Sequence, residues 1–176
     1  MTFEQDPDLT ELRNSLGREM AEEAAEDERL TAAYDRRRFD LAMVAKEMVN
    51  RGSRVSVVFS GHTFSGLVVG AGPDHVTVQG AGQIADIRID AGFWSILPGA
   101  DEGGGNVAGE ETLTARLAEA ADRGGMVRLA LAGGEIVIGR VDVVASDHVE
   151  LVDADDRTLY VPAGLILAIV RSSESQ

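Results

Sequence analysis

The chain has no cysteine, a single lysine (Lys46), four prolines and one tryptophan among its 176 residues. Without cysteine the protein forms no disulfide, no thiolate metal site and no cysteine nucleophile, a composition that suits the cytoplasm. No run approaches the roughly 18 to 20 apolar residues that span a bilayer, and residues 1–6 lack the apolar region of a secretion signal. We therefore expect a cytoplasmic protein. The frequent arginine, alanine and glycine indicate a high-GC bacterial genome.

Acidic residues outnumber basic ones by 30 to 16, so the formal net charge is −14 at pH 7. Such a charge repels nucleic acid and anionic membranes, because affinity for phosphate comes largely from Lys and Arg that release counterions. The acid is concentrated in residues 1–50, with thirteen acidic and seven basic side chains, whereas residues 51–98 have three of each. With 44% hydrophobic residues the chain still has enough apolar mass for a packed core.

An acidic helical arm is predicted over residues 1–50. Asp6 before Pro7 is typical of a helix start, and Arg51-Gly52 is typical of a helix end. Two apolar stripes recur at spacings of three and four residues. They are Leu9, Leu12, Leu16 and Met20, then Leu30, Tyr34, Leu41, Val44, Ala45 and Met48. We expect the second stripe to pack against the segment that follows, and the first to be available for self-association or a partner protein.

From Val55 the apolar period changes to two, which is typical of half-buried strands. Five short strands are predicted in residues 51–98, near 55–59, 64–69, 76–78, 84–89 and 93–97, with glycine-containing turns between them. Residues 99–112 are rich in glycine and acid, so we predict a linker there.

The same pattern returns in residues 113–171. A short helix with Leu113 and Leu117 ends at Arg123-Gly124, and five strand-like segments follow. Matching positions are separated by 72 or 73 residues: Arg51-Gly52 with Arg123-Gly124, Gly66 with Gly139, Asp74-His75-Val76 with Asp147-His148-Val149, and Ala91-Gly92 with Ala163-Gly164. We interpret these matches as an internal duplication.

A helix followed by five short strands, with Gly66 and Asp74 in one unit and Gly139 and Asp147 in the other, resembles the Sm-like (LSm and Hfq-type) family of SH3-like small β-barrels. The resemblance implies an α+β fold in which the helical arm precedes two tandem five-stranded barrels, each preceded by a helix. The corresponding domains are 1–50 (arm), 51–98 (first barrel), 99–112 (linker) and 113–171 (short helix and second barrel). Because a barrel of this size buries little surface alone, we expect the two to pack together or to assemble between chains.

The resemblance also implies a ring that binds single-stranded RNA, with a base held by an Asp–x–aromatic–x–Asn element and an Arg-Gly pair. His75 and His148 follow the aspartates and are able to stack a base, but no asparagine follows at that spacing. Ala-Gly stands where Arg-Gly is expected, although RNA pockets need a cation near phosphate. Asp74, His75, Asp147 and His148 are therefore weak ligand candidates, and Sm-like RNA binding is the alternative function.

No residue set predicts an enzyme. Residues 80–85 match the G-x-G-x-x-A dinucleotide pattern, but strand alternation continues where the pattern requires a helix. Residues 153–156 lack the glycine and distal glutamate of a calcium loop, and Ser60, His62 and Ser65 lack the other groups of a catalytic triad. We expect no catalytic residue, no metal and no cofactor.

The remaining hypothesis is a non-catalytic interaction or regulatory module that engages a protein partner or forms an oligomer. The candidate partner contacts are Leu9, Leu12, Leu16 and Met20 in the arm and Trp94 in the first barrel. Trp94 adjoins Phe93 and also suits core packing.

Overall fold

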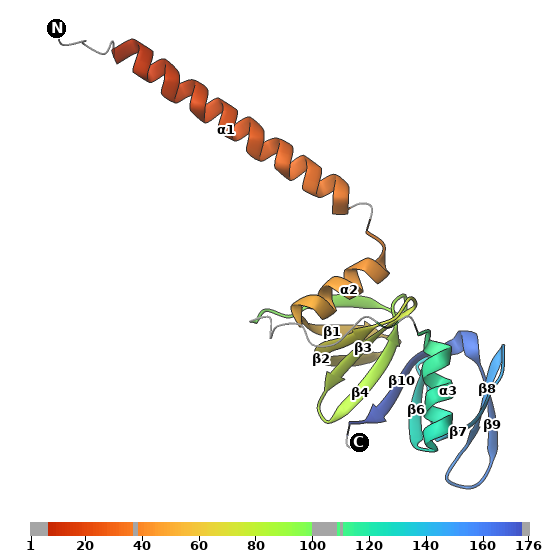
Figure 1. The fold of residues 1–176 in the computed structure, drawn as a ribbon. Coiled ribbons are helices and arrows are strands. Elements are labelled where there is room, and N and C mark those ends of the chain that lie inside the picture. Colours follow the sequence, from red (N-terminus) through yellow and green to blue (C-terminus); the bar gives the residue numbers. More distant parts are fainter. Residues whose placement is uncertain (1–6, 37–38, 100–108, 110, 174–176) are drawn as a thin grey trace. The chain divides into compact units, whose positions relative to one another are not determined.

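The computed structural model describes residues 7–36, 39–99, 109 and 111–173. The chain divides into two compact units, Met1–Asp40 and Leu41–Gln176 (Figure 1). In the first unit, helix α1 spans Pro7–Arg36, and its side chains are described for residues 17, 18 and 20–34. Helix α2, Leu41–Arg51, belongs to the second unit. The helical segment predicted for residues 1–50 is thus two helices that belong to different units.

The second unit is built on one antiparallel sheet of ten strands. Its strands are β1 Arg54–Phe59, β2 His62–Ala71, β3 His75–Gly80, β4 Gln83–Arg88, β5 Phe93–Ile96, β6 Met126–Leu131, β7 Ile136–Val144, β8 His148–Val152, β9 Thr158–Pro162 and β10 Ile166–Ser172. Helix α3, Leu113–Arg123, precedes β6, and a single 3-10 turn, Ala163–Leu165, precedes β10. The strand order is β5-β1-β2-β3-β4-β10-β6-β7-β8-β9.

The predicted pair of separate five-stranded barrels is wrong. The sheet is open, and its two edges are β5 and β9. Strand β4 pairs with β10, so that Ile87 lies opposite Ala168 and Ala85 opposite Val170. Alternation and turn residues specify each hairpin. The pairing of two strands that are distant in the sequence uses backbone N–H and C=O groups, which nearly every residue carries, so it leaves no mark in the sequence. The pattern therefore did not specify that β4 and β10 pair and join the two strand sets into one sheet.

The two halves of the sheet have the same strand order, β5-β1-β2-β3-β4 and β10-β6-β7-β8-β9. The pairing registers also agree, because Val55 lies opposite Gly66 in the first half and Val127 opposite Gly139 in the second. Both glycines lie where the next strand passes closely. A Cβ on Gly66 would lie 2.1 Å from the carbonyl oxygen of Gln79, and one on Gly139 would lie 2.8 Å from that of Val152.

Each helix of the second unit covers one of two core clusters. Helix α2 buries Ala45, Met48 and Val49 in the cluster formed with β1 to β4. Helix α3 buries Leu113, Leu117 and Ala120 in the cluster formed with β6 to β10. Full burial of a leucine or valine side chain contributes about 1.5–3 kcal/mol, so these contacts hold both helices on the sheet. In the predicted second stripe, Met48 is therefore in the core, whereas Leu30 and Leu41 are exposed.

The pattern of residues 80–85 belongs to the β3–β4 hairpin. Its turn residues Ala81 and Gly82 have φ angles of 51° and 72°, as in the tight turns of two-residue hairpins. Residues 153–156 form the corresponding turn between β8 and β9, where Asp153 Oδ1 accepts hydrogen bonds from the backbone N–H groups of Asp155 and Arg157. The aspartate cluster thus stabilises its own turn.

Candidate interaction surfaces

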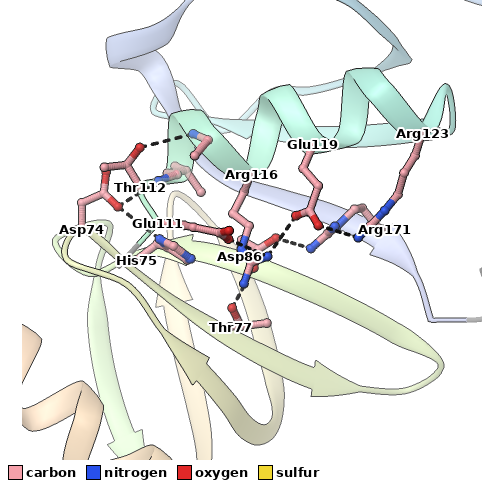
Figure 2. Close-up of polar contacts among 12 residues, drawn as sticks. Asp74, His75, Thr77, Asp86, Glu111, Thr112, Arg116, Glu119, Arg123 and Arg171 are labelled. Atoms are coloured by element: carbon pink, nitrogen blue, oxygen red, sulfur yellow. Dashed lines mark hydrogen bonds and ion pairs between the residues drawn. The ribbon is translucent and has the colours of Figure 1, made fainter. Parts of the chain in front are cut away.

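A polar network crosses the junction between the two halves of the sheet (Figure 2). Asp86 on β4 is fully buried and accepts a hydrogen bond from the Thr77 hydroxyl at 2.7 Å. Its second carboxylate oxygen accepts one from the guanidinium of Arg171 on β10. A buried carboxylate is tolerated only where its charge is compensated and hydrogen-bonded. The Asp86–Arg171 pair therefore depends on the β4·β10 pairing.

Helix α3 adds a second set of ion pairs over the junction. Arg116 forms ion pairs with Glu111 at 3.0 Å and Glu119 at 2.9 Å, and Arg123 lies 2.6 Å from Glu119. Burial raises the pKa of Glu119, but the Arg116 hydrogen bond and the nearby guanidinium groups outweigh burial and hold that pKa below its ordinary value. Glu119 is thus ionised at neutral pH and forms its ion pairs within α3, where the charge of Arg171 on β10 also acts on it.

A groove of about 950 Å³ lies beside this network, between β2, β3 and α3. Its lining includes Arg116, Arg123 and Arg171 together with Leu67 and Met126. Each of these arginines forms an ion pair with Glu119 or Asp86, so their charges are already balanced. The groove consequently offers little net positive charge to an anion.

Asp74 and His75 join the first half of the sheet to α3. The Asp74 carboxylate accepts a hydrogen bond of 2.9 Å from the backbone N–H of Leu113, in the first turn of α3. The same oxygen lies 3.1 Å from Nδ1 of His75. The side chain of His75 is 2% exposed, so it presents no face to a ligand in this structure. Asp74 therefore holds the start of α3, and His75 is buried against Asp74.

Asp147 and His148 occupy the matching positions in the second half, but they are on the surface. His148 Nδ1 lies 2.7 Å from Asp147, and the His148 ring lies 5.8 Å from the Tyr160 ring on edge strand β9. The hydrogen bond that the His148 ring donates to the Asp147 carboxylate is the main cause that raises the pKa of His148 above its ordinary value. The same hydrogen bond lowers the pKa of Asp147. The two matched histidines therefore differ in burial, since the side chain of His75 is 2% exposed and that of His148 is 33% exposed.

The candidate partner contacts fall in two places. Met20 on α1 is 68% exposed, while the side chains of Leu9, Leu12 and Leu16 lie outside those that the structure describes. Trp94 on edge strand β5 packs against the first core cluster, and its indole N–H donates to the carbonyl oxygen of Ile89 at 3.1 Å.

Sequence reasoning missed several residues of these surfaces. Phe93, Ile96 and Tyr160 are large, more than half exposed, and lie on the two edge strands. The alternation of β5 and β9 indicated strands, but only the strand order shows that these are the sheet edges. Asp86 and Arg171 were also missed, because nothing local marks a strand residue as part of a buried ion pair.

No protein-family model matches the chain, and no curated protein matches it. Among the described residues, no three histidine, aspartate or glutamate side chains gather as a metal site would require. No helix in the described part of the chain is both long enough and apolar enough to cross a membrane.

Proposed function

We propose that this protein is a non-catalytic interaction module whose helix α1 binds a helix of a partner protein. The observation that carries the proposal is the exposed apolar stripe of α1, on which Met20 is 68% and Leu30 52% exposed. At 3.6 residues per turn, positions 20, 30 and 34 fall within a sector of about 80°. Positions 9, 12 and 16 fall in the same sector, and so do Glu23 and Asp27, so the stripe consists of two apolar segments separated by this acidic pair.

The width and charge of α1 define the partner. A sector of about 80° is narrower than the face that a helix buries in a globular core, and it suits the seam between two helices. Five acidic residues lie within positions 22–28, and two of them, Glu23 and Asp27, lie in the sector of the stripe between Met20 and Leu30. We therefore expect a partner helix whose apolar seam carries lysine or arginine opposite Glu23 and Asp27, since opposite charges at such an interface favour pairing.

RNA binding, the alternative, has weaker support. His75 is buried, and His148 lies between the carboxylates of Asp147 and Glu150, which repel phosphate. A binding site for single-stranded RNA requires both a stacking plane and nearby cations. The exposed pair of His148 and Tyr160 offers the first requirement but not the second.

The test is cross-linking of the full chain in extracts of its source cells, with identification of cross-linked peptides by mass spectrometry. The double variant Met20→Glu/Leu30→Glu should lose at least 90% of the cross-links to α1. The control Ala25→Glu/Ala32→Glu adds the same charge on the opposite side of the helix and should retain them. Equal loss in both variants, or cross-links from α1 only to a second copy of this chain, would contradict the proposal.

A further inference from the structure

The β4·β10 junction brings together three elements that each have a counterpart in the other half of the sheet. By strand order and register, β10 corresponds to β5 and β4 to β9. Helix α3 corresponds to α2, because each precedes the first strand of its half and Leu113 matches Leu41 at the repeat distance of 72 residues. Strand β4 pairs with β10 and contacts α3, whereas their counterparts β9 and β5 are the two edges of the sheet and do not pair with each other.

The residues that are buried at the junction have exposed counterparts. Leu113 is 6% exposed and Leu41 is 55% exposed. Ala168 on β10 is fully buried, whereas Phe93 at the matching position of β5 is 63% exposed.

On the other strand, Asp86 of β4 is fully buried, whereas Tyr160 at the matching position of β9 is 66% exposed. The two edges of the sheet therefore carry the counterparts of the two strands that pair at the junction. In these counterparts Tyr160 stands in place of Asp86 and Ile96 in place of Arg171.

We propose that a second copy of this chain occupies these edges, so that β9 of one copy pairs antiparallel with β5 of the next. Transfer of the β4·β10 register places Phe93 opposite Val161, Trp94 opposite Tyr160, and Ile96 opposite Thr158. This inference deepens the proposed interaction function by naming a partner for the sheet, and it does not involve α1.

The Asp147–His148 pair supports the same assembly independently of the strands. Asp74 accepts the backbone N–H of Leu113 at the start of α3. In the assembly, the Asp147 carboxylate of one copy accepts a hydrogen bond from the backbone N–H of Leu41, at the start of α2 in the next copy. The side chain of Asp147 is 84% exposed and thus accessible for this contact. A carboxylate at a helix N-terminus is favourable because it satisfies an unpaired N–H and the positive end of the helix dipole.

The composition of the two edges favours pairing with another strand. Protected edge strands carry charged side chains, particularly lysine, that prevent association. Strands β5 and β9 contain no charged residue. Pro162 at the end of β9 corresponds to Arg88, which lies outside the register of the β4·β10 pair, so its missing N–H removes no ladder hydrogen bond.

The contact uses different surfaces on the two copies, so it is heterologous. Such contacts produce a closed ring when the rotation between copies closes and a filament when it does not. Two copies joined by one such contact leave one edge strand unpaired on each copy, and these edges can bind further copies. We expect more than two copies in each particle.

The first measurement is the mass of the purified full chain by light scattering during gel filtration, at concentrations from 1 to 100 μM. A mass of at least three chains supports the inference. A monomer across this range contradicts it. The variant Tyr160→Lys places a charge on the β9 edge and should reduce the assembly to monomers, whereas the control Ile138→Lys, at an exposed position on β7, should leave it intact. Equal assembly of the two variants contradicts the proposed edge.

The second measurement tests the register by disulfide formation, for which the cysteine-free chain is a clean background. Ile96→Cys and Thr158→Cys variants of the full chain should cross-link to each other when mixed under mild oxidation, since paired residues lie at Cα separations of about 5.5 Å, within the range of a disulfide. Ile96→Cys mixed with Glu135→Cys is the control. Cross-linking of the control as readily as the test pair would overturn the register.

The inference and the proposed function fail separately. If the purified chain is monomeric while the α1 cross-links persist, the edge pairing is wrong and the partner-helix function stands. If Met20→Glu/Leu30→Glu leaves the α1 cross-links unchanged while Tyr160→Lys dissociates the assembly, the partner-helix function is wrong and the edge pairing stands.

Discussion

Asp86 and Arg171 form an ion pair between β4 and β10, at the point where the two halves of the sheet meet (Figure 2). The Asp86 side chain is fully buried, and that of Arg171 is 17% exposed. The charge of Asp86 therefore depends on Arg171 and on the hydroxyl of Thr77 for its compensation.

Removal of Arg171 should destabilise the sheet strongly. We expect Arg171→Met to lower the free energy of unfolding by about 3–5 kcal/mol, because it removes the only ion-pair partner that Asp86, a buried carboxylate, has among the described residues. Urea denaturation followed by circular dichroism measures this loss. The double variant Asp86→Leu/Arg171→Met should recover most of it, since no charge then remains buried. A loss below about 1 kcal/mol in Arg171→Met would show that the pair is dispensable.

The hairpins of this fold could be predicted from the sequence, but their assembly could not. Alternation and turn residues located β1 near residues 55–59, β4 near 84–89 and the helix that ends at Arg123. The pairing of β4 with β10 depends on backbone hydrogen bonds and on Asp86, which nothing in the local sequence marks as part of a buried ion pair. The sequence therefore predicted the order of the elements but not the open sheet.

The candidate site was also only partly predictable. The tripeptide match of Asp74-His75-Val76 with Asp147-His148-Val149 indicated equivalent positions, and both pairs contain the same Asp–His contact. Their burial differs because His75 is buried in the first pair, beside an Asp74 side chain that is 47% exposed, whereas the second pair lies on the surface beside edge strand β9. Exposure of this kind is a property of the tertiary arrangement and not of the local sequence.

The two matched glycines should differ in their tolerance of alanine. A Cβ at Gly66 would lie 2.1 Å from a backbone oxygen that cannot move away without disrupting β3, whereas the contact at Gly139 is 2.8 Å. We expect Gly66→Ala to cost about 3 kcal/mol or more and Gly139→Ala about 1–2 kcal/mol. Gly125→Ala is the control, because a Cβ there meets no atom within 4 Å. Urea unfolding that ranks Gly139→Ala as the more damaging would contradict this reasoning.

The titration of His148 should report its contact with Asp147. Because the hydrogen bond to Asp147 raises the pKa of His148 in the folded state, the contact stabilises the fold at pH values below the unfolded pKa. That contribution is lost as pH rises through the folded pKa. For Asp147, whose pKa is lowered, the contribution is present above its unfolded pKa and is lost as pH falls through the folded one.

NMR titration of the histidine ring protons measures this effect directly. We expect the pKa of His148 to lie above its ordinary value in the unaltered chain and to fall in Asp147→Asn, which retains the shape of the side chain but not its charge. Glu135→Gln, which removes a charge elsewhere on the surface, is the control. An unchanged pKa of His148 in Asp147→Asn would show that another group causes the shift.

RNA binding should be weak and sensitive to salt. The chain carries a net charge of −14, and the arginines of the groove are paired with Glu119 and Asp86. Few positively charged side chains are left to displace counterions from a phosphate backbone, and this displacement supplies most of the affinity of such complexes.

Fluorescence anisotropy with labelled oligo(U) and oligo(A) of 20 nucleotides should give dissociation constants no tighter than about 10 μM at about 0.15 M salt. A plot of the logarithm of the binding constant against the logarithm of the salt concentration has a slope of about −0.7 for each phosphate that the protein neutralises on a single strand. We expect a slope that corresponds to no more than one or two such phosphates. Nanomolar binding that survives this salt concentration would require a site that the described residues do not explain, and it would favour the RNA-binding alternative.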